Sequence, residues 1–266
     1  MSGPARFPVV RVAGIPLHAV TRAHAVAHVF SELDAGRGGW ILTLGLEPLR
    51  LQLRDRPFRR LCREADLVLP ESAPLVWASR VQGTPLPERV SGAGLVHALA
   101  AAAAEEARSA FLVGGLPATA LSAAGVLRES QPRLRIVGSM GPSRAPGPFA
   151  PQDDRVADLL VATRPDLVFV GRRSPDQEQW IRRMRPVLPE AWWIAVGTAF
   201  SALAGPLPGA PSWDRLADQA RPLTDAGLAA RRAARAETRL HDLPFTAQLL
   251  AGAAGARLMG TAARSL

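Results

Sequence analysis

Short apolar runs alternate along this chain with longer segments whose apolar residues recur at helical spacing. Seven runs have the length and composition of buried strands: Val9–Val12, Trp40–Thr43, Asp66–Leu69, Ala110–Val113, Leu134–Val137, Leu167–Val170 and Trp192–Val196. The helical segments between them include Thr21–Leu33, Glu47–Arg63, Gly94–Ala107, Pro117–Glu129, Asp153–Thr163 and Pro175–Leu188. Strands that are apolar throughout need cover on both faces. The pattern therefore predicts a Rossmann-like α/β fold with a mostly parallel sheet flanked by helices.

The sequence changes character after Gly205, which divides the chain into two predicted parts. Residues 1–205 form the predicted α/β domain, and residues 206–266 form a linker and a helical, basic C-terminal appendage. The segment Leu228–Leu266 carries six arginines: Arg231, Arg232, Arg235, Arg239, Arg257 and Arg264. A basic, partly amphipathic segment can lie on an anionic membrane surface. The open alternative is a helix that packs on the body of the protein.

The 32 basic residues of the 266-residue chain are all arginine, and the net charge is +9. This charge attracts anions such as nucleotides and anionic lipids. We do not expect nucleic acid as a partner, because the arginines are scattered and only 5% of residues are aromatic. Cys62 is the only cysteine, so a disulfide framework is excluded and a reducing cytoplasm fits. We expect neither a secretion signal nor a membrane span.

Small residues follow most of the predicted strands, at the edge where parallel α/β sheets bind ligands. The glycines at this edge are Gly45, Gly114, Gly115, Gly138, Gly171 and Gly197. Any one of them could simply allow a tight turn. Several at one edge favour a nucleotide or another phosphate ligand, because glycine lets backbone amides approach it closely. The chain lacks the G-x-G-x-x-G, P-loop, G-x-S-x-G and H-E-x-x-H motifs.

Three polar stretches hold the candidate site residues. Glu71 follows a predicted strand and can act as a general base for a hydroxyl group, or as a stabilising charge at a helix start. Ser174 before Pro175 predicts a helix N-cap with Gln177 in the first turn, a local role that needs no further function. The loop Pro87–Gly92 offers Arg89 beside a turn.

These stretches resemble, in their order along the chain, the motifs of the WecG/TagA/CpsF family of glycosyltransferases. The matching segments are Thr43, Ala65-Asp66, Pro87 to Gly92, Phe111 to Gly115, Ser174 to Trp180 and Phe200 to Gly205, the last expected as a strand end. The resemblance covers roughly Val12 to Gly205. It implies an inverting transferase that moves an N-acetylhexosamine-type sugar from a UDP-sugar to an undecaprenyl-diphosphate-linked acceptor in bacterial surface-polymer synthesis.

The resemblance also implies where the enzyme works and which residues serve it. It implies no metal or cofactor, a peripheral position at the cytoplasmic face of the cell membrane, and membrane contact through the C-terminal segment; a homo-oligomer is left open. It assigns catalysis to Glu71, Thr43 and Gln177. Substrate binding is expected of Arg89, Gly92, Gly114, Gly115, Gly171, Arg172, Gln177 and Glu178.

Several positions depart from the family pattern where the chemistry is expected. Glu71 stands for an aspartate, and the other departures include Gly45 for Asn, Ser72 for Gly, Arg172-Arg173 for Leu-Gly, Asp176 for Lys and Ser201 for Asp. Two alternatives therefore stay open. One is a weakly active or inactive family member that acts as a binding or scaffold protein. The other is an unrelated nucleotide-binding enzyme such as a dehydrogenase, which the missing glycine fingerprint disfavours.

Overall fold

The computed structural model describes residues 7–115, 118–141, 152–204 and 242–257. Its centre is a six-stranded sheet in the order β4-β3-β8-β7-β5-β6, in which every neighbouring pair is parallel. The strands are β3 (Gly39–Leu44), β4 (Leu67–Pro70), β5 (Ser109–Gly114), β6 (Arg135–Met140), β7 (Leu167–Gly171) and β8 (Trp192–Ala195). The predicted parallel α/β sheet is confirmed.

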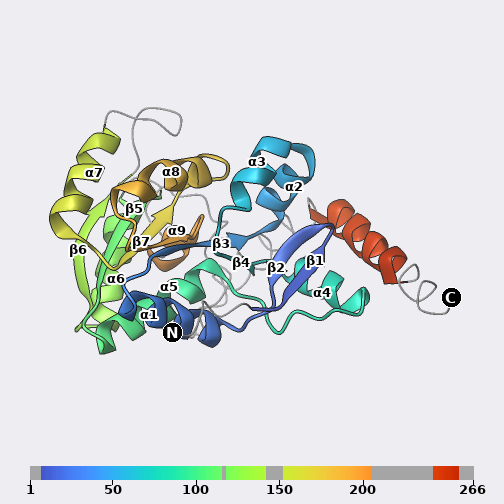
Figure 1. Cartoon of the computed structure of the whole chain (residues 1–266), viewed down its shortest axis with the longest axis horizontal. Coiled ribbons are helices and arrows are strands. Elements are labelled where there is room, and N and C mark those ends of the chain that lie inside the picture. Colours follow the sequence, from blue (N-terminus) through green and yellow to red (C-terminus); the bar gives the residue numbers. More distant parts are fainter. Residues whose placement is uncertain (1–6, 116–117, 142–151, 205–241, 258–266) are drawn as a thin grey trace, which may run out of the picture.

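Helices cover both faces of this sheet (Figure 1). One face packs against α1 (Arg22–Asp34), α5 (Gly92–Glu105), α6 (Thr119–Ser130) and α9 (Ala199–Ala204). The other face packs against α2 (Leu46–Arg54), α3 (Arg56–Cys62), α4 (Ala73–Val81), α7 (Gln152–Thr163) and α8 (Asp176–Met184), which the 3-10 turn η1 (Arg185–Val187) follows. Successive strand residues alternate between the two cores; in β7, Phe169 points to the first core, and Val168 and Val170 point to the second.

Three expectations about local structure are wrong. The run Val9–Val12 lies outside the parallel sheet: as β1 it pairs antiparallel with β2 (Ile15–His18) in a separate hairpin. The single helix expected over Glu47–Arg63 is two helices, because the Asp55 backbone is extended and its carboxylate caps α3 by accepting from Phe58 N at 3.0 Å. The segment that begins at Phe200, expected as a strand end, belongs to the short helix α9.

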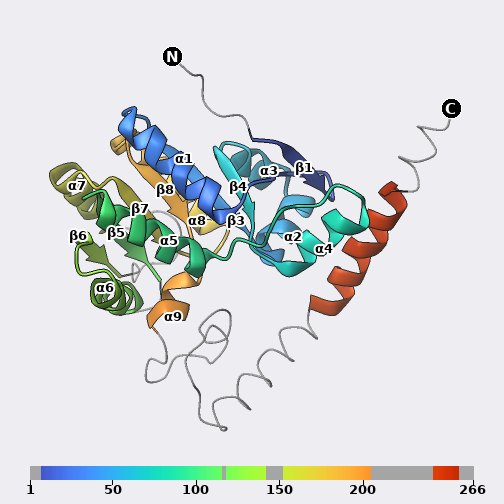
Figure 2. The ribbon, with the colours of Figure 1, turned by 90° about the horizontal axis from the view of Figure 1, so that it is seen from below.

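Residues 242–257 form a further helix, drawn in red beside α4 in both ribbon views (Figures 1 and 2). Asp242 pairs with Arg50 of α2 at 2.6 Å, and the Arg50 guanidinium lies 4.5 Å from the centre of the Phe245 ring. Leu249 and Ala253 are buried in the second core. This part of the appendage therefore packs on the body. Of the six arginines named for the appendage, only Arg257 lies within the described residues. The predicted linker that begins at residue 206 lies outside them.

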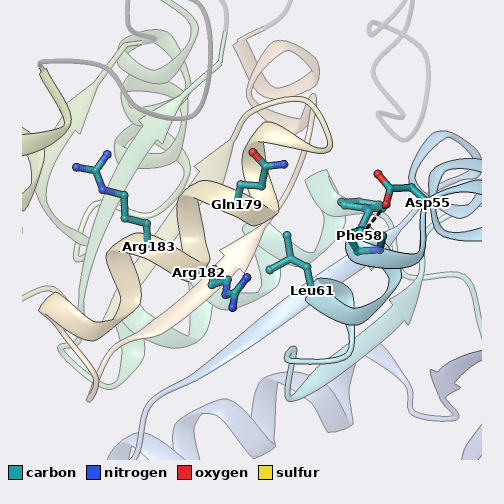
Figure 3. Close-up of a pocket in the computed structure, with 7 residues that line it drawn as sticks. Asp55, Phe58, Leu61, Gln179, Arg182 and Arg183 are labelled. Carbon is teal, nitrogen blue, oxygen red and sulfur yellow. Dashed lines mark hydrogen bonds between the residues drawn. The ribbon is translucent and has the colours of Figure 1, made fainter.

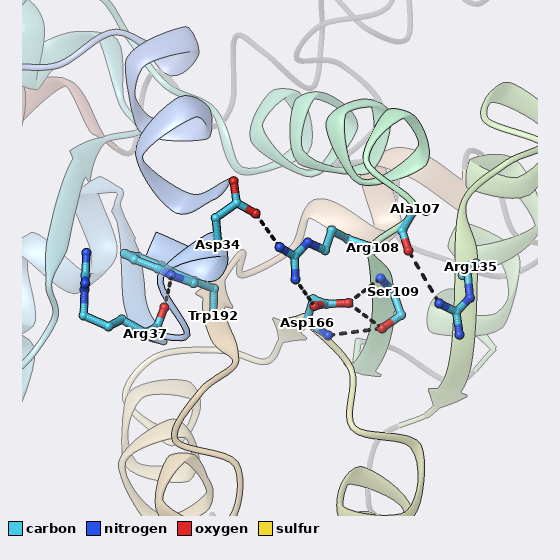
Figure 4. Close-up of polar contacts among 8 residues, drawn as sticks. All are labelled: Asp34, Arg37, Ala107, Arg108, Ser109, Arg135, Asp166 and Trp192. Carbon is cyan, nitrogen blue, oxygen red and sulfur yellow. Dashed lines mark hydrogen bonds and ion pairs between the residues drawn. The ribbon is translucent and has the colours of Figure 1, made fainter. Parts of the chain in front are cut away.

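The amino-terminal edge of the sheet carries a paired polar network (Figure 4). Asp166, just before β7, accepts from Ser109 N at 2.7 Å and from Ser109 Oγ at 2.8 Å. Arg108 reaches the same carboxylate at 3.0 Å and also pairs with Asp34 at the end of α1. This network ties β5 and β7 to α1 at the edge opposite the predicted site.

Candidate active site

Two predicted catalytic side chains, Glu71 and Thr43, meet at the carboxyl edge of the sheet. Thr43 lies in β3, and Glu71 follows β4, the neighbouring strand. The Thr43 hydroxyl is 3.3 Å from Glu71 Oε2 and 2.9 Å from the carbonyl oxygen of Ala195 at the end of β8. A hydroxyl has one hydrogen, so Thr43 donates to one of these two acceptors at a time. Thr43 therefore lies between β8 and the Glu71 carboxylate and is a hydrogen-bond donor to each.

The amino end of α5 holds the other carboxylate oxygen of Glu71. Gly92 N, the first amide of α5, donates to Glu71 Oε1 at 3.1 Å. A Cβ on Gly92 would lie 2.9 Å from the carbonyl oxygen of Val196 and 3.1 Å from Glu71 Oε1, so only glycine fits without displacing both groups. The partial positive charge of a helix amino end favours an ionised carboxylate. Glu71 is half-buried, which leaves its carboxylate within reach of a substrate.

Arg89 lies in the loop that runs along Pro70 and Glu71 at the end of β4. Its Nε donates to the backbone carbonyl of Glu71 at 2.6 Å, and Val90 N donates to the Pro70 carbonyl at 2.8 Å. The loop is thus held along the end of β4. The Arg89 side chain itself is exposed, so its charge is available to an anion beside Glu71.

Gln177 lies deeper and joins two loops. Its Oε1 accepts from Gly197 N at 2.8 Å and from Arg172 N at 3.3 Å, and its Nε2 donates to Glu178 Oε1 at 3.4 Å. Only 3% of Gln177 is exposed. The amide therefore clamps the loops that follow β7 and β8. Its predicted catalytic role stays a prediction, while the geometry gives it a positioning role.

The predicted N-cap at Ser174 is wrong. The residue that precedes α8 is Pro175, which offers no side-chain cap, and the Ser174–Pro175 peptide is cis. The Ser174 hydroxyl instead donates to Glu178 Oε1 at 2.7 Å, because Glu178 is fully buried and needs a partner. Burial raises the pKa of Glu178, and its Oε2 has no hydrogen-bond partner in the described structure. Substrate contact by Glu178 stays a prediction; the side chain lies inside the protein.

The glycines expected to contact substrate at β5 and β7 have a packing reason to be glycine. Gly114 and Gly171 are register partners, and a Cβ on Gly171 would lie 2.5 Å from the Phe200 ring. Gly114 and Gly115 have φ values of +97° and +81°, which other residues rarely adopt. Close packing of β5, β7 and α9 therefore accounts for these residues, and ligand contact stays a prediction.

The two arginines that follow β7 point in different directions. Arg172 turns inward: its side chain is 12% exposed, lies over the Trp180 ring at 5.4 Å and is 4.0 Å from Asp153. Burial lowers the pKa of Arg172. Arg173 turns outward, is 79% exposed and pairs with Glu47 of α2 at 3.3 Å. The accessible cation at this position is thus Arg173, whereas Arg172 is the arginine expected to bind substrate.

The strand alternation contained the signal that separates the two arginines. Val168 and Val170 point to the core that contains Trp180, so Arg172 continues the same series and Arg173 falls on the other side. The predicted alternation ended with β7, so it did not separate Arg172 from Arg173 in the following loop.

A separate open cavity of about 500 Å³ lies between α3 and α8 (Figure 3). It is lined by Asp55, Pro57, Phe58, Leu61, Gln179, Arg182 and Arg183. None of the predicted site residues lines it, so it does not form part of the site around Glu71. Among the described residues, no group of three or more histidines, cysteines and carboxylates could hold a metal ion. The described helices include none that could cross a membrane.

Comparison with known proteins agrees with the motif order. The chain is 27% identical over 182 residues to an N-acetylglucosaminyldiphosphoundecaprenol N-acetyl-beta-D-mannosaminyltransferase of Bacillus spizizenii, covering 68% of each chain. It is 26% identical, with the same coverage, to the transferase of that name from Bacillus subtilis. The family model described as Glycosyl transferase WecG/TagA/CpsF family matches residues 10–217, which include Glu71, Thr43 and Gln177. Because this match spans most of the chain, the protein belongs to the WecG/TagA/CpsF family of glycosyl transferases.

Proposed function

We propose that this protein transfers an N-acetylhexosamine-type sugar, with inversion, from a UDP-sugar to a polyprenyl-diphosphate-linked acceptor in bacterial surface-polymer synthesis. The observation that carries the proposal is the placement of Glu71, a half-buried carboxylate held by Thr43 and the α5 amide at the carboxyl edge of the sheet. The two relatives are named as N-acetyl-mannosaminyltransferases of N-acetylglucosaminyldiphosphoundecaprenol. These names support an N-acetylhexosamine-type sugar and a lipid-linked acceptor as the substrate classes.

The proposed reaction uses Glu71 as the general base. Its carboxylate takes the proton of the acceptor hydroxyl while that oxygen attacks the anomeric carbon of the donor sugar. The bond from that carbon to the diphosphate oxygen breaks, and the electron pair leaves with UDP. Thr43 and Gly92 N fix the carboxylate, so that it does not have to be oriented during the reaction. Arg89 lies where it can attract the anionic substrates.

The proposed acceptor is a lipid, so we propose that the enzyme works as a peripheral protein at the cytoplasmic face of the cell membrane. The net charge of +9 favours contact with anionic lipid. The arginines predicted to make this contact lie outside the described residues, except Arg257. The described helix 242–257, which carries Arg257, is held on α2 by the ion pair between Asp242 and Arg50.

The second candidate is an inactive family member that binds a nucleotide or scaffolds other proteins. The substitution of glutamate for aspartate at Glu71 favours it, because the extra methylene moves the carboxylate by about an ångström, and such a shift can cost a large part of the rate. An inactive protein could bind UDP but would transfer no sugar, with or without Glu71.

The first test is ligand binding and turnover in parallel. A ligand at about 100 times its dissociation constant adds roughly 2.7 kcal/mol to the unfolding free energy, so a thermal-shift screen with UDP and UDP-sugars detects the donor site. Transfer to a lipid-linked acceptor is then followed by mass spectrometry. We expect Glu71→Gln to keep UDP affinity and to lose turnover about 1000-fold, since a general base contributes about 100- to 10,000-fold.

Two variants serve as controls for that test. Glu71→Asp restores the shorter carboxylate and keeps a base at the site. Glu105→Gln makes the same chemical change at an exposed position at the far end of α5 and should leave turnover unaltered. If Glu71→Gln turns over at the wild-type rate, the base assignment is wrong and another group must take the proton, whereas a wild-type protein that binds UDP but transfers no sugar supports the inactive-member hypothesis.

A further inference from the structure

The ion pair between Arg173 and Glu47 crosses the carboxyl edge of the sheet beside Glu71. Arg173 lies two residues beyond the end of β7, and Glu47 is the second residue of α2, which follows β3. Strand β8 lies between β3 and β7, so the pair spans the end of β8. The turn that leads into α2 contains Gly45, where a Cβ would lie 3.5 Å from Glu71 Oε2. The Arg173 cation is therefore held at the same edge of the sheet as the proposed base.

The backbone of Arg173 is fixed, whereas its side chain is exposed. The Arg173 carbonyl accepts from Gln177 N at 3.0 Å, and the preceding amide is held by Gln177 Oε1 at 3.3 Å. By contrast, the two partners of the ion pair are 79% and 58% exposed. An ion pair this exposed contributes little to stability. The Arg173 side chain can therefore leave Glu47 at little cost in free energy, while the Arg173 backbone stays in place.

Of the two neighbouring arginines, Arg172 is held inside the protein and Arg89 is anchored through one nitrogen to the loop of Glu71. Arg172 turns under α8 toward Trp180 and Asp153, and Arg89 donates its Nε to the Glu71 carbonyl. A guanidinium can donate two parallel hydrogen bonds to phosphate oxygens, and a diphosphate carries more negative charge than the single carboxylate of Glu47. A diphosphate that enters this edge is thus a stronger partner for Arg173 than Glu47 is.

We propose that Arg173 exchanges Glu47 for the diphosphate of the nucleotide-sugar donor and stabilises that diphosphate as it departs. This inference rests on the proposed function. In the transfer step the acceptor oxygen bonds to the anomeric carbon and its proton passes to Glu71. The bond from that carbon to the diphosphate oxygen breaks, and the diphosphate takes the electron pair. Arg173 forms no covalent bond; it donates hydrogen bonds to the oxygens on which the negative charge grows.

The test compares Arg173→Gln with Glu47→Gln in the full-length protein, by UDP titration and by turnover. We expect Arg173→Gln to weaken UDP binding about 10-fold and to lower kcat about 100-fold, since one donor to a developing anion is worth about 100- to 1000-fold. Glu47→Gln should tighten UDP binding several-fold, because it removes the competing carboxylate. The double variant should behave like Arg173→Gln alone.

Arg182→Gln is the matched control, because Arg182 is 62% exposed on α8 and pairs with Glu64 at 3.4 Å. It should change neither UDP affinity nor kcat. Equal losses of affinity in Arg173→Gln and Glu47→Gln would overturn the inference and make the pair a structural strap. Wild-type affinity and turnover in Arg173→Gln would overturn it too. A wild-type protein that binds no UDP would overturn the proposed function and this inference together, whereas the first two outcomes leave the proposed function intact.

Discussion

The two edges of the central sheet use polar residues in opposite ways. At the amino-terminal edge, the Asp166 carboxylate accepts from the Ser109 amide, the Ser109 hydroxyl and Arg108, so that protein donors surround it. At the carboxyl edge, Glu71 is half-buried as Asp166 is, but the ion pair between Arg173 and Glu47 lies at the surface, with side chains 79% and 58% exposed. Groups that satisfy one another inside the protein stabilise the fold, and groups held in place but left accessible can bind and react. The difference predicts that one edge serves stability and that the other, on the proposed function, serves the chemistry.

The largest expected effect on stability is at the amino-terminal edge. Asp166→Ala removes a charged acceptor and leaves the Ser109 amide and Arg108 without it, so we expect the unfolding free energy to fall by about 3 kcal/mol. Turnover per folded molecule should not change. Denaturant unfolding and single-concentration activity measure the two. Asp34→Ala, which removes the exposed outer partner of Arg108, is the control and should cost far less. Loss of turnover in folded Asp166→Ala would show that the amino-terminal edge also affects the chemistry and would contradict the proposed division of roles.

A smaller effect on stability, with a larger one on turnover, is expected at the carboxyl edge. Gln177→Leu leaves Gly197 N and Arg172 N without their acceptor, which should cost about 1–2 kcal/mol in unfolding free energy. Because the loops after β7 and β8 then shift, we expect turnover to fall at least about 10-fold. Gln179→Leu, two residues further along α8, is the matched control. A variant that is destabilised but fully active would show that the clamp serves only the fold.

The smallest expected effect is a change of stability with pH. It arises from a histidine that lies at neither edge of the sheet. His18 Nδ1 accepts from Val68 N at 2.9 Å, joining the β1–β2 hairpin to β4, and burial lowers the pKa of His18 from its usual 6.5. The folded state thus binds fewer protons than the unfolded state below that value, so stability is complete above about pH 6.5 and declines as the pH falls. Thermal unfolding between pH 7 and 5 measures this decline.

The variant His18→Asn tests whether His18 causes the decline in stability with acid. An asparagine oxygen can accept from Val68 N without titrating, so the decline in stability with acid should be shallower in this variant. The half-buried His28 and His97, whose pKa values burial also lowers, contribute to the remaining decline. An unchanged pH dependence would mean that another group governs the response to acid.

Much of the fold and part of the site could be predicted because they depend on local patterns. The buried strands were found from continuous apolar runs, and Glu71 was found because it directly follows one of them. The break at Asp55 was missed, although Asp followed by Arg-Pro carried the signal of a new helix start. The β1–β2 hairpin was missed because an apolar run does not state its partner strand.

The amino-acid sequence by itself determined the alternation of strands and helices, the edge at which polar residues gather and, through the order of the motifs, the family. Only the tertiary structure decided that Gln177 binds the loop at Gly197 and that Arg173 reaches Glu47. The physical reason is the strand order, which places β8 between β3 and β7 and so brings together residues from distant parts of the chain. Periodicity specifies which face of a strand a residue occupies, whereas its partners are set by which strands become neighbours.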